Sequence, residues 1–129
     1  MRTLFIFGLL FTVLISCKKD DQDLIGEWEV TAIRASESAD WENASQLYQF
    51  TFDDESNVSV MLDVNRCGAS YNRCSCGSMS FEPLACTEAC CDSEFAQKVI
   101  EYLTKIESHE IDGDELMLKG KRFIRLKRR

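Results

Sequence analysis

Apolar and polar residues alternate through most of the chain after residue 24, which is typical of half-buried β-strands. The alternating apolar positions are Leu24, Trp28, Val30 and Ala32 in one segment, Tyr48, Phe50 and Phe52 in a second, and Val58, Val60, Leu62 and Val64 in a third. The polar residues 53–57 between the second and third segments predict a hairpin turn. Residues 35–45 are small and acidic, and they predict a loop with Trp41 as its one large apolar side chain.

The last third of the chain predicts one amphipathic helix followed by strands. Asp92, Ser93 and Glu94 offer an N-cap with acids in the first turn. Apolar residues then recur at helical spacing, namely Phe95, Val99, Leu103 and Ile106, which places the helix at about 93–106. A hairpin with its turn at 112–113 and a strand over 122–127 follow, whereas residues 65–91 offer only a short strand near 78–82. We therefore expect an α+β fold for residues 24–129: a β-rich, small antiparallel barrel-like sheet with one amphipathic helix packed against it.

Composition narrows the class of protein. The chain has 129 residues, 45% of them hydrophobic, which suits one small domain. It carries 22 Asp and Glu against 15 Lys and Arg, a formal net charge of −7. Because nucleic-acid binding requires a surplus of basic residues to neutralise phosphates, this balance argues against a nucleic-acid partner.

Residues 1–16 predict a lipoprotein signal peptide. A basic start precedes an apolar run over residues 4–15, which is shorter than the roughly 20 residues that a transmembrane helix needs. The end of the run resembles the bacterial lipobox, with Ser16 as the small residue before Cys17. That resemblance implies diacylglycerol attachment and cleavage at Cys17, further acylation by fatty acids such as palmitate, and a membrane anchor. The alternative is an ordinary secretory signal followed by a chance cysteine.

Residues 17–23 would form the lipidated cysteine and a charged tether. The order of one basic and two acidic residues after Lys18 resembles the export signal of surface-exposed lipoproteins in Bacteroidota. A polar spacer without an address is the alternative. We therefore expect an outer membrane lipoprotein of the bacterial cell envelope, with periplasmic and surface orientations both open.

Six cysteines remain after Cys17, and in a small exported domain an even number predicts disulfides. They are Cys67, Cys74, Cys76, Cys86, Cys90 and Cys91. We exclude a strained Cys90–Cys91 bond and leave the other pairings open. A thiolate metal site is a weaker alternative, because zinc knuckles have a wider cysteine spacing and the lone His109 is distant in sequence. Redox catalysis is weaker still, since no Cys-x-x-Cys opens a helix.

Asn65, Tyr71, Thr87 and Cys91, together with the opening residues 24–28, form a recognisable pattern. This pattern, which covers about residues 24–127, resembles the META/HslJ-like domain. The resemblance implies a small α+β fold, an envelope location and frequent lipidation, but no established enzymatic activity. Two departures matter: Val64 replaces the cysteine that often precedes the asparagine, and the other cysteines are extra, so no disulfide pairing carries over. The Gly-x-Trp at residues 26–28 also resembles lipocalin-like lipoprotein domains.

Few residues suggest catalysis, and we predict no catalytic residues, no metal and no cofactor. His109 is the only histidine, and we expect an exposed strand position for it. Trp41 is either a partner anchor or a side chain packed over a barrel end. Seven basic residues crowd the last eleven positions, suited either to anionic partners or to a solvated edge strand with a frayed tail.

These observations predict a non-enzymatic, lipid-anchored protein of META/HslJ-like type with a binding or envelope-integrity role in stress. Its predicted partners are the membrane, through Cys17, and a protein or small molecule that the sequence does not identify. One alternative is a carrier that holds an apolar ligand inside the barrel, as lipocalins do. Another is an inhibitor-like binder that presents residues 65–91 as a rigid loop.

Overall fold

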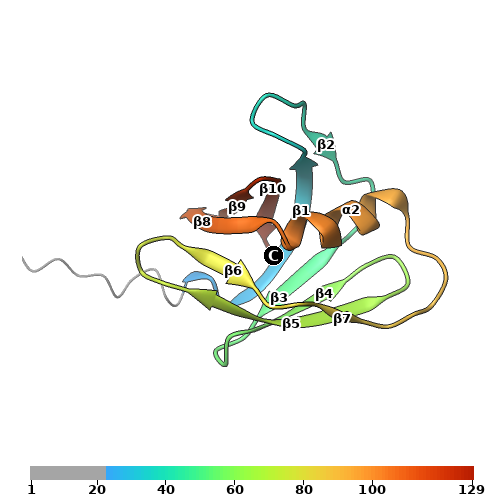
Figure 1. Ribbon diagram of the computed structural model, residues 1–129, viewed down its shortest axis with the longest axis horizontal. Helices are drawn as coiled ribbons and strands as arrows, with labels where there is room; N and C mark the ends of the chain where they lie inside the picture. Colours follow the sequence, from blue (N-terminus) through green and yellow to red (C-terminus); the bar gives the residue numbers. More distant parts are fainter. Residues whose placement is uncertain (1–22) are drawn as a thin grey trace, which may run out of the picture.

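A computed structural model describes residues 23–129, and the predictions for the signal peptide and Cys17 lie outside that range. Within that range strands dominate, and the helix α2 interrupts them (Figure 1). The elements are β1 (Gly26–Arg34), β2 (Glu42–Asn43), β3 (Gln49–Phe52), β4 (Asn57–Met61), β5 (Arg66–Arg73), β6 (Met79–Phe81), β7 (Ala85–Cys86), α2 (Glu94–Leu103), β8 (Ile106–Asp112), β9 (Glu115–Gly120) and β10 (Phe123–Arg128).

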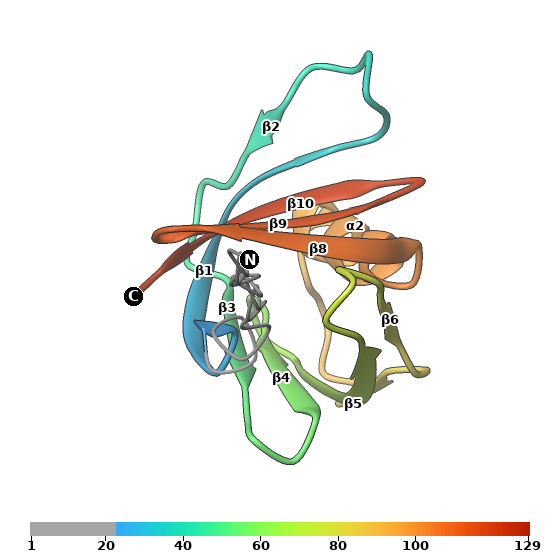
Figure 2. The same ribbon diagram turned by 90° about the vertical axis from the view of Figure 1, so that its left-hand side faces the viewer.

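All named strand pairs are antiparallel, and the sheet bends into a nearly closed barrel (Figure 2). The strand order is β6-β5-β4-β3-β1-β10-β9-β8, with β2 beside β1 and β7 beside β5. A bridge between Ser78 and Ser108 brings the two ends of this order together at β6 and β8. The β-rich α+β prediction is therefore confirmed.

The alternating pattern determines which side chains fill the barrel. Trp28 and Val30 of β1 and Phe50 of β3 point inward and are fully or almost fully buried. The largest fully buried side chains are Trp28, Tyr48, Phe50, Phe52, Leu24, Ile33, Met79, Leu103, Leu116, Leu118, Ile124 and Leu126. Strands and helix contribute to one continuous apolar core, so side chains occupy the barrel interior.

Helix α2 begins where the sequence predicts and ends earlier. The Ser93 hydroxyl caps it by accepting a hydrogen bond from the Ala96 N–H at 3.2 Å. Phe95, Val99 and Leu103 bury the apolar face as expected. Ile106, the last of the predicted helical positions, instead opens β8 and pairs with Gly120 of β9. Ile106 therefore belongs to the sheet and not to the helix.

Strand β5 is the main element that the sequence prediction misses. Its eight residues lie in the stretch assigned to turns and cysteines. The inward positions of β5 include Cys67 and Tyr71, which are 3% and 4% exposed, with Ala69 half-buried between them. A thiol, a methyl group and a phenol give a weak hydrophobic signal, and Gly68 weakens it further.

Candidate functional site

A buried asparagine connects the turn after β4 to the segment that leads into α2. Asn65 is 8% exposed, and its amide nitrogen donates to the Ala89 carbonyl at 2.7 Å and to Asp92 Oδ2 at 2.6 Å. Its amide oxygen accepts from the Thr87 hydroxyl at 2.7 Å and from the Ala89 N–H at 2.8 Å. The side chain thus uses both donors and both acceptor positions.

Asp92 strengthens the same connection from the other side. Its Oδ1 accepts the backbone N–H groups of Val64 at 2.9 Å and of Asn65 at 3.2 Å. Partial burial opposes ionisation of the carboxyl, but the hydrogen bonds from Val64 and Asn65 outweigh it and lower the pKa of Asp92. The carboxylate is therefore a structural acceptor that holds the turn.

A second carboxylate holds the N-terminus of α2. Asp63 Oδ2 accepts the Ser93 hydroxyl at 2.7 Å and the Ser93 N–H at 3.0 Å, and Oδ1 accepts the Tyr48 hydroxyl at 2.9 Å. Desolvation opposes ionisation, yet these hydrogen bonds from Ser93 and Tyr48 lower the pKa of Asp63. Burial, followed by the interaction with Asp63, raises the pKa of Tyr48 although its bond to Ser93 acts the other way. The phenol is therefore a neutral donor in this cluster.

The positions taken from the family resemblance separate in space. Asn65 and Thr87 meet directly, and Cys91 immediately precedes Asp92 of the same cluster. Tyr71 lies elsewhere, where its hydroxyl donates to the Asp53 carbonyl at 3.1 Å and its ring packs on Phe52. Sequence reasoning missed Tyr48 and Asp63 as members of the cluster, because their partners become neighbours only through the fold.

The six cysteines after Cys17 form three disulfides in the structure: Cys67–Cys86, Cys74–Cys76 and Cys90–Cys91. The Cys90–Cys91 pair is the one that our sequence analysis excluded. The two residues are adjacent in sequence, and their Cα atoms lie 3.0 Å apart. Among residues 23–129, no group of three or more His, Cys, Asp or Glu side chains is placed to hold a metal ion.

Only Cys67–Cys86 joins residues distant in sequence, and we expect it to dominate the disulfide contribution to stability. It joins β5 to β7 over a separation of 19 residues, and chain-entropy arguments assign such a loop about 3 kcal/mol. Replacing both cysteines by alanine should lower the free energy of unfolding in urea by about that amount. The matched double variant C90S/C91S, whose loop is minimal, should cost less than about 1 kcal/mol. Equal losses in the two variants would contradict this ranking.

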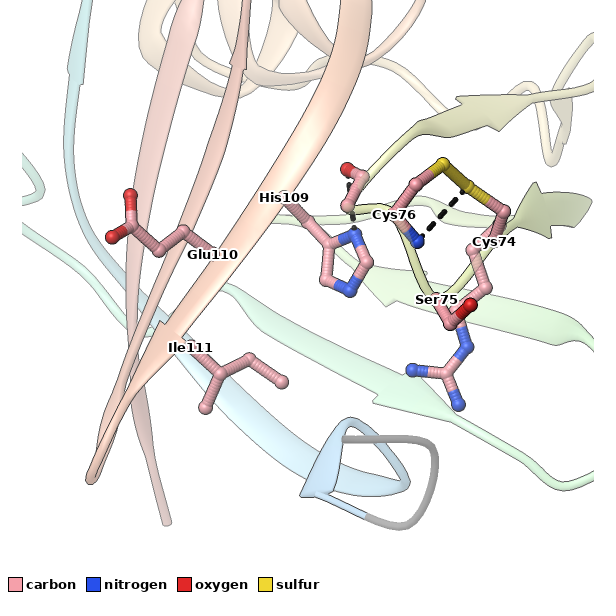
Figure 3. Close-up of a pocket in the computed structure, with 8 residues that line it drawn as sticks. Cys74, Ser75, Cys76, His109, Glu110 and Ile111 are labelled. Carbon is pink, nitrogen blue, oxygen red and sulfur yellow. Dashed lines mark hydrogen bonds between the residues drawn. A yellow bond between two sulfur atoms is a disulfide. The ribbon is translucent and has the colours of Figure 1, made fainter. Parts of the chain in front are cut away.

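The Cys74–Cys76 disulfide lines a pocket of about 250 Å³ together with Arg73 and His109 (Figure 3). His109 lies on β8 and is half-buried, not exposed as predicted. Its backbone N–H donates to the Gly77 carbonyl at 2.8 Å, and its Nδ1 lies 3.2 Å from the same oxygen. Because a carbonyl only accepts, Nδ1 carries the proton in this contact.

Trp41 and several basic C-terminal residues take part in contacts between guanidinium groups and aromatic rings. The guanidinium groups of Arg34 and Arg125 each lie 4.6 Å from the centroid of the Trp41 ring. Arg128 stacks 4.2 Å over the ring of Trp28, and Arg122 lies 5.5 Å from that of Tyr102. Several of these basic side chains therefore pack on aromatic rings and do not only face solvent. Within the described part of the chain, no helix is both long and apolar enough to span a bilayer.

In residues 23–129 these features define a small, nearly closed antiparallel barrel whose helix α2 is fixed by a polar cluster around Asn65, Asp63 and Asp92. The META domain family model matches residues 22–129, so the chain belongs to the META domain family, and the resemblance inferred from its motifs is confirmed.

Two solved structures share the fold. One is a DUF4847 family protein from Bacteroides vulgatus ATCC 8482, with a TM-score of 0.64 and 11% identity over 82% of this chain and 94% of that one. The other is a protein from Burkholderia xenovorans, with a TM-score of 0.66 and 16% identity over 84% of this chain and 86% of that one. No curated protein sequence matches the chain.

Proposed function

We propose that this META domain protein is a lipid-anchored protein of the outer membrane that acts by binding or by supporting envelope integrity under stress, and not by catalysis. The observation that carries the non-enzymatic part is the use of the polar cluster. The hydrogen bonds of Asn65, Asp63 and Asp92 connect the turn after β4 to the start of α2. Such side chains stabilise a binding scaffold, whereas catalytic groups must face a substrate.

The anchor at Cys17 would hold the domain close to the bilayer. The core begins at the fully buried Leu24, seven residues after Cys17, and seven extended residues span at most about 25 Å. The basic end of β10 lies beside this entry point, since Arg128 donates to the Asp23 carbonyl and the Arg129 N–H donates to the Glu27 carbonyl. That position would bring cationic side chains toward anionic lipid headgroups.

Metabolic labelling with a palmitate analogue followed by membrane fractionation tests the proposal. The full chain should incorporate label and sediment with outer membranes, and C17S should lose both properties because serine cannot form the thioether. The C90S/C91S variant controls for loss of other thiols and should still be labelled. A C17S protein that is still labelled and still sediments would refute the anchor.

The functional role needs a second measurement. A strain without the gene should be more sensitive to envelope stress, and the full chain should restore its growth while C17S should not. The carrier alternative receives no specific support, because core side chains such as Trp28 and Phe50 fill the barrel interior.

A further inference from the structure

We propose that the Cys74–Cys76 disulfide is a thiol–disulfide exchange site that accepts two electrons from a dithiol of a protein or peptide. This activity lies beyond the binding role proposed above and uses other residues. Both cysteines are exposed, and they occupy the turn between β5 and β6, where the pocket gives a reductant access to the sulfurs (Figure 3). Cys67, in contrast, is 3% exposed.

The bond contributes little as a structural link. It spans a separation of two residues, and a loop that short restricts the unfolded chain only slightly. Hydrogen bonds hold the turn independently: the Cys74 N–H donates to the Ser78 carbonyl at 3.1 Å, and the Gly77 N–H donates to the Cys74 carbonyl at 3.1 Å. The turn can therefore keep its shape with the disulfide open, and the two thiols stay close enough to form it again.

Strand β8 fixes the turn from outside. His109 reaches the Gly77 carbonyl through both its backbone N–H and its Nδ1. Gly77 itself has a φ of +90°, a conformation that favours glycine. Exchange sites need sulfurs in a fixed position, and these contacts supply it without using the sulfur atoms.

The surroundings favour a thiolate at Cys74. The Cys76 N–H donates to Cys74 Sγ at 3.2 Å, and Arg73 and His109 line the same pocket. Donor groups and positive charge stabilise a leaving thiolate. The Glu110 side chain lies on the other side of β8 from the sulfurs and pairs with Lys119 at 2.5 Å, so its charge is directed away from them (Figure 3).

The exchange proceeds in two balanced steps. A thiolate of the dithiol attacks Cys76 Sγ, which breaks the S–S bond, forms a mixed disulfide with Cys76 and releases Cys74 as a thiolate. The second thiolate of the dithiol then attacks the other dithiol sulfur, which is bonded to Cys76 in the mixed disulfide. This step releases Cys76 as a thiolate. The dithiol becomes a disulfide, and its two protons end on Cys74 and Cys76, which are reduced by two electrons.

The test mixes the full chain, purified in detergent, with one equivalent of a reduced two-cysteine peptide without oxygen. About one peptide disulfide per chain should form, and mass mapping after alkylation should find Cys74 and Cys76 modified about tenfold faster than Cys90 and Cys91. The C74S/C76S variant should lose peptide oxidation. The C90S/C91S variant, which lacks the other short exposed disulfide, should retain it.

Two results would overturn the proposal. One is peptide oxidation by C74S/C76S at the rate of the unaltered chain. The other is mass mapping of the unaltered chain in which Cys74 and Cys76 stay blocked while another pair opens, and this readout decides the question even where the double variant folds poorly. Circular dichroism melting curves show whether each double variant is folded. Peptide oxidation by a folded variant can be compared with that of the unaltered chain, and otherwise the mass mapping decides.

Discussion

Replacing Gly120 by alanine should destabilise the protein by about 3–5 kcal/mol, a large part of the stability of a domain this size. A Cβ at this position would lie 2.1 Å from the Lys105 carbonyl oxygen and 3.0 Å from the Glu107 nitrogen. Both are backbone atoms, so no side chain can rotate away to relieve the contact. Urea unfolding followed by circular dichroism measures the loss directly.

The cost of the Gly120 substitution should be concentrated where the chain passes from α2 into β8. Gly120 ends β9 and pairs with Ile106, and the Lys121 N–H donates to the Lys105 carbonyl at 3.2 Å. Moving that carbonyl away therefore disturbs the start of β8, the strand that meets β6 to close the barrel. Hydrogen exchange of G120A should show loss of protection in β8 and β9 before β3 and β4.

Gly68 provides the matched control for Gly120. It also lies in a strand, but its added Cβ would meet only the Val58 carbonyl, at an ordinary 3.9 Å. Alanine suits a strand at least as well as glycine, so G68A should change stability by less than about 1 kcal/mol. Equal stabilities of G120A and G68A would contradict the close approach of β9 to Lys105.

The sequence predicts the parts of this fold that depend on local periodicity. Alternation locates β1, β3 and β4, and the acidic turn between β3 and β4 is as expected, with Asp53 accepting the N–H groups of Glu55 and Asn57. Strand β5 is missed because its buried positions carry a cysteine and a tyrosine instead of aliphatic residues. The end of α2 is misplaced because Ile106, which fits the helical spacing, instead begins β8 and pairs with Gly120 of β9.

The residues of the candidate site are likewise predicted only in part from the sequence. The resemblance identifies Asn65 and Thr87, which meet, but it does not identify Asp63, whose carboxylate accepts hydrogen bonds from Tyr48 and Ser93. Those contacts join residues 15 and 30 positions apart: the pairing of β3 with β4 brings Tyr48 beside Asp63, and the return of the chain to α2 brings Ser93 to the same carboxylate. Asp92 is read from the sequence as part of a helix cap, whereas its carboxylate turns back to the β4–β5 turn and Ser93 alone caps the helix.

Asn65 is the residue of this cluster whose loss should cost most. Replacing it by alanine leaves the Thr87 hydroxyl, the Ala89 N–H and carbonyl, and Asp92 Oδ2 without their amide partner. At about 1 kcal/mol for each hydrogen bond, with a further penalty for groups left buried, N65A should lower the free energy of unfolding by about 3–4 kcal/mol. Asn72 is the matched control, because its amide makes one exposed bond, to Glu82 at 3.0 Å, and N72A should cost less than about 1 kcal/mol.

A charge-altering variant separates hydrogen bonding from packing at the same position. N65D keeps the size of the side chain but places a second carboxylate where the amide now donates to Asp92 at 2.6 Å. Like charges at that distance raise the pKa of one carboxyl, so the folded form of N65D holds a proton that the unfolded chain releases. A group whose pKa is raised by folding loses its stabilising contribution as pH rises. The deficit of N65D relative to the unaltered chain should therefore be largest at neutral pH and shrink toward pH 4, whereas the deficit of N65A, which includes only the loss of Asn65's contribution to the low pKa of Asp92, should change little above about pH 4. Parallel pH profiles for the two variants would mean that the contact with Asp92 is not what holds Asn65 in place.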